Sequence, residues 1–475
     1  MKVRRYASPT LKACAGLLIA VTLILTFTVS DYYIFNRVSE FGFIFVFCQW
    51  MKKAGILLIA LAVFYDKKCC ADIAKYVLPV FVIVSSFTYG GFFDATAITA
   101  ESTPADLVYA HINEFMPKAA NMALFFISNA LYLAICALLF VRDGYKANGA
   151  SFIWLPFAML ACIPLNIFEN FFDINDFSRD HFLWFKNFTL WHLLAILILV
   201  AFTVGSYYFL KNKPRDKQDE FLAAAAIVLL LQYHSKDSMI MGDGYNVYHT
   251  VFACIPLFIC NIGVYIASIS VIVKKKVLYA ISFFVHAAGA VTVFVYFGKD
   301  EMSNYGIFCS YSILYFCLTH CLLFALSVLP TALGHYKFTP KDCVIPLIYY
   351  FAVIVVASLA SALVTSASMG FNYNGYTLSD GEYLFPNYAF TQINPLPFEV
   401  PTWKLTIWRY DLNMLYILGL YAAYVAIFYA FNGAYYAFLA IRKKALYAPA
   451  PATVQDEIQA AAEIAVAKVF EEDED

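Results

Sequence analysis

The sequence predicts an all-α polytopic membrane protein, a bundle of transmembrane helices. Hydrophobic residues make up 62% of the chain and charged residues only 14%, whereas about a quarter of the residues in a soluble domain are charged. Apolar runs recur along the whole sequence, and they have the roughly 20-residue length that crosses a hydrocarbon core about 30 Å thick. Both observations place the chain in a membrane.

About twelve spans follow from the apolar runs and from the charged residues that separate them. Lys52 and Lys53 lie inside the second expected span, and the seventh is short. The expected spans are 11–29, 41–65, 76–94, 119–141, 152–170, 188–210, 219–234, 248–273, 277–297, 305–330, 344–367 and 411–440.

The charges of the connections predict the orientation. A strict alternation of twelve spans puts the connections rich in lysine and arginine on one side, which is the cytoplasmic side in membrane proteins. The acidic and Ser/Asn/Gly-rich connections, including 95–118 and 368–410, fall on the other side. We therefore expect a multi-pass protein of the cell membrane with both termini in the cytoplasm.

Short matches between distant segments suggest an internal duplication. The segment 45–49 (FVFCQ) resembles 257–261 (LFICN), and Gly144-Tyr145-Lys146 resembles the turn at 334–337 (GHYK). Spans one to six would then match spans seven to twelve, as two parallel six-helix halves. The matches are short, so an appended N-terminal bundle stays open as the alternative.

Composition argues against several classes of ligand. The net charge is −1 and no basic patch with interleaved aromatic residues is present, so no nucleic acid is expected as a partner. The twelve cysteines are scattered through the apolar runs, and no CxxC pair with zinc-like spacing is present. We therefore expect neither a metal nor a cofactor.

The candidate site centres on the segment from Cys254 to Asn261 (CIPLFICN), where proline, thiol and amide occur together at membrane depth. Cys260 is expected half-way through the eighth span, with His286 and His320 at similar depth in the next two. A thiol beside a base is a usable nucleophile, and histidine can also protonate a leaving group. The structural alternative is a packing cysteine and histidines bonded to neighbouring carbonyl groups.

The long connection 368–410 supplies further candidates. It holds Asn387-Tyr388-Ala389-Phe390, and Trp403 and Trp408 precede the last span. One interpretation is an interfacial aromatic belt. The other is a lid over a cavity, with Asn387 orienting a polar headgroup. Of the remaining histidines, His192 is expected near headgroups and His335 in a solvated loop.

Several of these segments together resemble a known family. The segment 255–260 (IPLFIC) is followed by the small residues 287–290, by His320, by the turn 334–337 and by Asn387-Tyr388-Ala389-Phe390 with Pro395. In this order they resemble the YwaF-like family of bacterial integral membrane proteins, which is related to eukaryotic transmembrane protein 164. The resemblance covers roughly residues 185–440. Phe258 departs from the family pattern, which has histidine two residues before the cysteine.

The resemblance implies a cysteine-dependent acyltransferase that acts on membrane phospholipid. Cys260 would accept the acyl group and His320 would act as its base and acid, while His286, Asn261, Asn387 and Tyr388 would bind substrate. The alternatives are a secondary transporter with two six-span halves and a non-catalytic membrane scaffold.

The expected organisation has three parts. Residues 1–184 form an N-terminal half, residues 185–445 form the YwaF-like membrane domain, and residues 446–475 form an Ala/Pro linker with an acidic tail. Membrane lipid is the expected partner, and the acidic tail is a candidate docking segment for a protein partner.

Overall fold

The computed structural model describes residues 2–28, 34–35, 42–89, 118–168, 182–235, 255–295, 306–369, 372–373, 376–377, 386–392 and 399–446. The chain divides into two compact units, residues 1–421 and 422–475. Apart from the last helix, which crosses the boundary, every described element belongs to the first unit. The predicted linker and acidic tail lie outside the described residues.

The membrane-helix class is confirmed by nine helical segments, within the described residues, that are long and apolar enough to cross a membrane. Seven lie on single helices: α1 (Lys2–Thr28), α4 (Phe43–Phe64), α5 (Lys68–Thr88), α7 (Lys118–Asp143), α10 (Leu190–Leu210), α17 (Tyr311–Ala332) and α19 (Met414–Leu446). The eighth joins the 3-10 turn η5 (Pro340–Cys343) to α18 (Val344–Ser368). The ninth joins α15 (Lys276–Ile281), the π-helical turn η3 (Ser282–His286) and α16 (Ala287–Val295).

Three expected spans do not appear among these nine. Expected span 152–170 is a 3-10 turn, η2 (Gly149–Trp154), followed by the short α8 (Leu155–Ala161). Expected span 219–234 is α11 (Arg215–His234), which begins with several charged residues. Expected span 248–273 contains α14 (Ile259–Val273), which has only 15 residues. The twelve-span count is therefore not shown by the described part of the chain.

Strands occur as three short antiparallel pairs in the described residues. β1 (Trp184–Phe185) pairs with β2 (Gly306–Ile307), and β3 (Asn372–Tyr373) pairs with β4 (Tyr376–Thr377). β5 (Lys404–Ile407) pairs with β6 (Tyr410–Asn413). β1 and β2 tie the segment before α10 to the segment before α17, which are adjacent helices.

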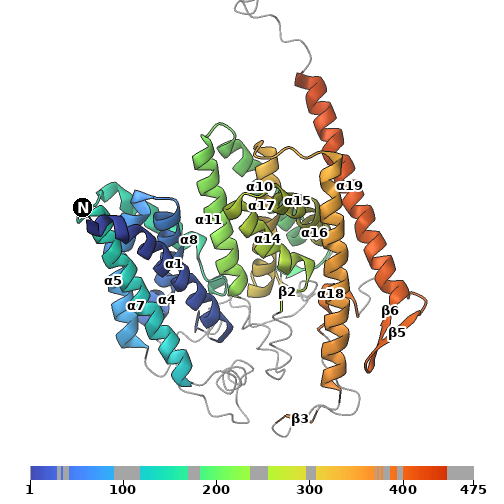
Figure 1. Cartoon of the computed structure of the whole chain (residues 1–475), viewed down its shortest axis with the longest axis horizontal. Helices are drawn as coiled ribbons and strands as arrows, with labels where there is room; N and C mark the ends of the chain where they lie inside the picture. Colours follow the sequence, from blue (N-terminus) through green and yellow to red (C-terminus); the bar gives the residue numbers. More distant parts are fainter. Residues whose placement is uncertain are drawn as a thin grey trace, which may run out of the picture. The chain divides into compact units, whose positions relative to one another are not determined.

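The helices of residues 1–421 pack as two bundles (Figure 1). The N-terminal bundle consists of α1, α4, α5, α7, η2 and α8, and the second bundle contains α10, α11 and α14 to α18. Two parallel six-helix halves are not shown, because α10, the expected sixth helix of the first half, packs on α16 and α17 instead. The likeness is local: Gly144 and Gly334 both follow a long helix with φ of 77° and 78°, a conformation that favours glycine.

The two bundles meet where α11 contacts α4 and α1. Lys53 of α4 donates a hydrogen bond to Gln232 Oε1 of α11 at 3.2 Å. The Gln232 amide donates in turn to the carbonyl oxygens of Ala161 and Ile163, at 3.4 and 3.1 Å. A buried polar group is costly unless it is hydrogen-bonded. This network explains how α4 forms a span although Lys53 lies within it.

A second buried polar cluster fixes the turn after α7. Asp72 and Lys75, one turn apart on α5, form an ion pair at 3.2 Å with fully buried side chains. Lys75 also donates to the Gly144 carbonyl oxygen at 3.1 Å. Asp72 Oδ2 accepts from the Asn148 N–H and the Ser151 hydroxyl, at 3.1 and 3.0 Å. One ion pair therefore holds the connection between α7 and η2 against α5.

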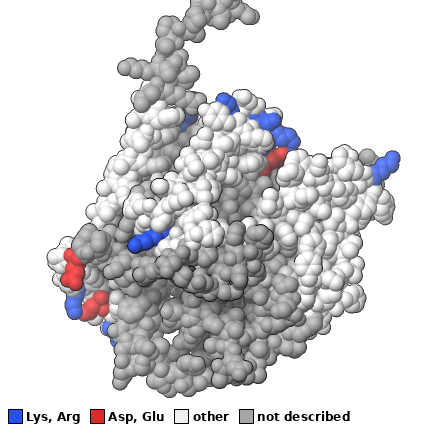
Figure 2. Space-filling view, turned by 180° about the vertical axis from the view of Figure 1, so that it is seen from behind, with Lys and Arg blue, Asp and Glu red and all other residues white. Residues whose placement is uncertain are grey.

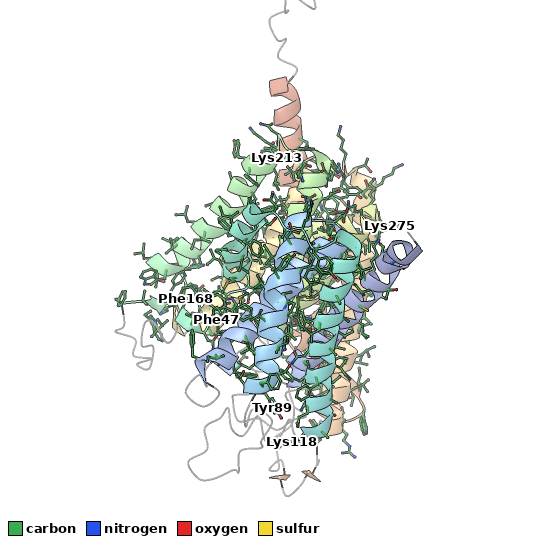
Figure 3. All side chains as sticks on the ribbon, turned by 90° about the vertical axis from the view of Figure 1, so that its left-hand side faces the viewer. Phe47, Tyr89, Lys118, Phe168, Lys213 and Lys275 are labelled. Atoms are coloured by element: carbon green, nitrogen blue, oxygen red, sulfur yellow. The ribbon has the colours of Figure 1, made fainter. Side chains whose placement is uncertain are left out.

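Connections rich in lysine lie together at one end of the first unit, called here the basic end. Lys213 and Lys275 lie at this end and Tyr89 and Lys118 at the opposite one (Figure 3). Ion pairs link neighbouring connections: Lys67 with Glu220, Lys274 with Asp219, and Lys276 with Asp342. Most of the described surface drawn in Figure 2 is uncharged, as expected for helices that face lipid.

His335 lies at the basic end and is buried, so the prediction that it is solvated is wrong. Gln218 donates through its amide to two carbonyl groups, so its Oε1 accepts from His335 Nε2 at 2.6 Å. The other ring nitrogen, Nδ1, lies 3.6 Å from Asp219 Oδ1. Burial, helped by the positive charge of Arg215, lowers the pKa of His335 from 6.5 to about 4.

This pKa predicts a pH-dependent stability. Between pH 6.5 and about 4 the unfolded chain binds a proton at His335 and the folded chain does not, so the free energy of unfolding falls as the pH is lowered through this range. Replacing His335 with glutamine keeps a hydrogen-bond donor for Gln218. The free energy of unfolding of this variant is expected to depend less steeply on pH. Thermal unfolding of the two proteins at several pH values measures it, and an unchanged slope in His335→Gln would contradict the assignment.

Candidate functional site

The helix that carries Cys260 begins inside the apolar part of the second bundle. Residues 255–258 are not helical, because Pro256 lacks an N–H and favours extended backbone in the residue before it. Phe258 is extended, with ψ 143°, and α14 starts at Ile259. Cys260 is thus in the first turn of a helix, where N–H groups lack helical acceptors. The expected position half-way along a continuous span is wrong.

The three residues expected at similar depth do lie at similar distances from the basic end. Cys260 is about 20 Å along α14 from Val273 at the normal helical rise. His286 is about 15 Å from Lys276, and His320 about 18 Å from Ala332. For Cys260 and His286 the match follows from the two-residue turn, Lys274 and Lys275, that joins α14 to α15.

Close packing brings His286 to the same helix as Cys260. A Cβ added at Gly263 would lie 2.6 Å from His286 Nδ1, so α14 approaches the imidazole at this point as only glycine allows. Ile259, one turn earlier on the same face, lies beside Gly289 of α16. His286 Nε2 is 3.1 Å from the Tyr349 hydroxyl of α18. His286 is therefore enclosed between α14 and α18.

Cys260 lies on a face of α14 that points into the bundle. Gly263, Val264, Ala267 and Val271, which share this face by helical periodicity, are buried. α14 packs against α11 and α17 as well as against α15 and η3. The Cys260 thiol is half-buried, and its Sγ lies 3.5 Å from Oδ1 of the adjacent Asn261.

His320 of α17 has its proton on a defined ring nitrogen. Its Nδ1 is 2.8 Å from the Phe316 carbonyl oxygen, and because a carbonyl only accepts, Nδ1 carries the hydrogen. Neutral His320 then has its lone pair on Nε2, which is the form that a general base needs. The ring packs on Phe316, with 4.1 Å between ring centroids, and is 94% buried.

The segment 386–392 is docked in a strained conformation. Asn387, Ala389 and Phe390 have φ values of 47°, 49° and 59°, and non-glycine residues rarely adopt such values outside tightly held sites. Two reciprocal bonds fix its ends: Asn387 N–H donates to Gln392 Oε1 at 2.9 Å, and Gln392 N–H donates to Asn387 Oδ1 at 3.1 Å.

This segment is anchored to α18 and reaches the start of α14. The Tyr388 N–H and the Thr391 hydroxyl both donate to Ser361 Oγ, at 3.1 and 3.2 Å. The rings of Tyr388 and Phe390 pack edge-on against Phe258, with centroids 6.3 and 5.5 Å apart. Phe258, where the family pattern has histidine, is therefore an aromatic contact for this segment.

The structure brings the candidates together in two groups. Cys260, Asn261 and His286 are gathered on and against α14, and Tyr388 with Asn387 reaches this helix through Phe258. The hydrogen bond shown for His320 goes to its own helix. His192 does not face headgroups: its side chain is buried and its ring bonds to the Phe188 N–H and the Phe294 carbonyl oxygen.

Three supporting residues were not expected from the sequence. They are Tyr349, which contacts His286, and Ser361 and Gln392, which hold the 386–392 segment. Ser361 and Thr365, one turn apart on the largely apolar α18, could have pointed to this contact, since polar residues inside a span usually have a partner. Thr365 Oγ1 accepts from the Gln392 amide at 2.7 Å. No cluster of metal ligands occurs among the described residues.

These observations define an integral membrane protein with a half-buried thiol in the first turn of the apolar helix α14. The TMEM164 family model matches residues 184–421, half of the chain, and the protein belongs to the TMEM164 family. The match covers the second bundle from β1 to the beginning of α19. No curated protein matches the chain, and no solved structure does.

Proposed function

We propose that this protein is a cysteine-dependent acyltransferase that acts on membrane phospholipid, with Cys260 as the nucleophile. One observation carries the proposal: the thiol lies in the first turn of a helix that begins within the apolar part of the family-matched bundle. The helix dipole at such a position favours the thiolate over the thiol.

The proposed reaction has two half-reactions. Cys260 Sγ attacks the carbonyl carbon of a phospholipid ester, so a C–S bond forms and the ester C–O bond breaks. His320 Nε2 takes the thiol proton and gives it to the leaving oxygen, which departs as a lysophospholipid hydroxyl. The hydroxyl of a second lipid then attacks the thioester, transfers its proton through His320, and restores the thiol.

The other candidates receive binding roles in this proposal. Asn261 and the α14 N–H groups lie next to the thiol and would stabilise negative charge on the reacting carbonyl oxygen. His286, enclosed between α14 and α18, would fix the shape of the acyl pocket with Tyr349. Asn387 and Tyr388 would form the headgroup side, where the strained 386–392 segment covers Phe258.

Three broader expectations belong to the same proposal. The kinship with YwaF-like bacterial proteins rests on the motif order given above. Gating of lipid entry by 368–410 rests on the described part, 386–392, which contacts the start of α14 through Phe258. A cytoplasmic location of both termini, with an acidic tail that docks a protein, rests on the basic end and the tail composition. A transporter with two six-span halves is not favoured, because those halves are not shown.

The proposal predicts an acyl-thioester that can be trapped. Incubating the purified protein with phospholipid is expected to add one acyl mass at Cys260, which hydroxylamine removes. His320→Asn is expected to slow its formation by about 10²–10⁴-fold, the usual effect of losing a general base. Quenched-flow mass spectrometry measures the rate, and His192→Asn is the control, since both ring nitrogens of His192 are bonded to backbone. Acylation of a different residue would contradict the assignment.

A further inference from the structure

Among the described residues, no carboxylate pairs with a lysine that is buried in the middle of the N-terminal bundle. Lys52 is the tenth residue of the 22-residue α4, and its side chain is 94% buried. Its ammonium lies over the rings of Phe125 and Tyr132 of α7, 4.4 and 5.9 Å from their centroids. Ring faces attract a cation, but they supply no carboxylate or carbonyl acceptor.

The comparison with the other buried lysines of the bundle makes this arrangement informative. Lys53 donates to Gln232, and Lys75 pairs with Asp72 and the Gly144 carbonyl. Within the described residues, Lys52 is the buried lysine whose ammonium has neither a hydrogen bond nor an ion pair. Charged groups at membrane depth are usually paired or placed at functional sites.

Two further polar atoms of the same region lack partners. Gln49 precedes Lys52 by one turn on the same face of α4, and its Nε2 is buried without a hydrogen bond. Asn129 lies between Phe125 and Tyr132 on the facing stripe of α7. Its Nδ2 donates to Ser86 Oγ at 2.8 Å, while its Oδ1 has no partner. Buried polar atoms are normally hydrogen-bonded. The polar atoms around Lys52 therefore lack a hydrogen-bonding partner that a bound molecule could supply.

The chemistry of the free donors identifies the missing group. Lys52 Nζ and Gln49 Nε2 are donors one turn apart, an arrangement that suits the two oxygens of a carboxylate. Phe45, Val46 and Phe125 form a buried apolar cluster beside these donors. An acyl chain suits this setting better than a strongly hydrated acid does, because its burial is favourable.

We infer that the N-terminal bundle binds a carboxylate, that of a fatty acid, between Lys52 and Gln49 of α4 and the facing side of α7. This site lies outside the family-matched residues 184–421 and is separate from Cys260. It is a binding site, and no chemical step is assigned to it.

Photocrosslinking tests the site on the full-length protein in lipid nanodiscs. An oleic acid analogue with a diazirine near its carboxylate is expected to label peptides of α4 or α7 saturably. Unlabelled oleate should compete and methyl oleate should not. Lys52→Met is expected to weaken labelling by about tenfold or more, the effect of losing a hydrogen bond to a charged group. Lys12→Met removes an exposed lysine of α1 and is the matched control.

The outcomes separate the possibilities. Competition by oleate but not acetate supports a fatty acid, and competition by both supports a carboxylate site for a small acid. Equal competition by methyl oleate, or unchanged labelling in Lys52→Met, overturns the inference. Gln49→Leu is a second variant, and it is expected to lose less photocrosslinking than Lys52→Met. As a control for folding, the thermal midpoint of Lys52→Met should be no lower than that of the wild type. Labelling in Cys260→Ala should be unchanged, which keeps this test independent of the proposed acyl transfer.

Discussion

Replacing Cys260 with alanine is expected to lower phospholipid acyl transfer by about 10³-fold or more, because removal of the nucleophile leaves no atom to carry the acyl group. Transfer of a labelled acyl chain between two phospholipids, followed by mass spectrometry, measures the rate. The helix should persist, since alanine is a strong helix former.

Controls for this experiment come from other thiols of the same bundle. Cys317 and Cys321 lie on α17 on either side of His320, so their alanine variants test whether any thiol near the site suffices. Both are expected to retain transfer within a few-fold of the wild type. Full transfer by purified Cys260→Ala would exclude Cys260 as the nucleophile.

Replacing Asp72 with asparagine is expected to lower the free energy of unfolding by about 3–5 kcal/mol, the usual cost of breaking a buried ion pair on one side. The Lys75 ammonium, whose side chain is fully buried, would lose its counter-charge. The turn after α7 would also lose a charged acceptor for Asn148 and Ser151. Denaturant or thermal unfolding in detergent measures the loss.

An exposed ion pair supplies the comparison for Asp72. Asp411 pairs with Lys404 across the β5–β6 hairpin at 3.0 Å, with 42% and 65% of their side chains exposed. Because surface ion pairs contribute little, Asp411→Asn is expected to lower the free energy of unfolding far less than Asp72→Asn does. The double variant Asp72→Asn/Lys75→Met should recover part of the stability, since it removes the stranded charge. Similar losses for Asp72→Asn and Asp411→Asn would contradict the assigned role.

Several features of the fold could be predicted because they depend on composition and chain order alone. Apolar runs of sufficient length must become helices in a membrane, since no water is present to satisfy the backbone. Nine of the expected spans appear on this basis among the described residues. In a hairpin of two neighbouring helices, residues that are equally far from the turn lie at the same depth in the membrane. This explains why Cys260 and His286 were expected together.

The features of the fold that could not be predicted from the sequence depend on contacts between residues far apart in the chain. Apolar run length predicted a helix from 248, but Pro256 and the packing of Phe258 on Tyr388 and Phe390 accompany a later start at Ile259. His335 was expected in water because its loop is polar, yet Gln218 and Asp219 of another helix enclose it.

The sequence by itself determined that this protein is a helical membrane protein and which segment holds its candidate thiol, because apolar length and motif order are local properties of the chain. The tertiary structure decided where α14 begins, which ring nitrogen of His320 carries the proton, and which buried lysines have acceptors. Each of these depends on which carbonyl, amide or aromatic group lies beside the residue once the helices have packed, and helical periodicity alone does not specify that neighbour.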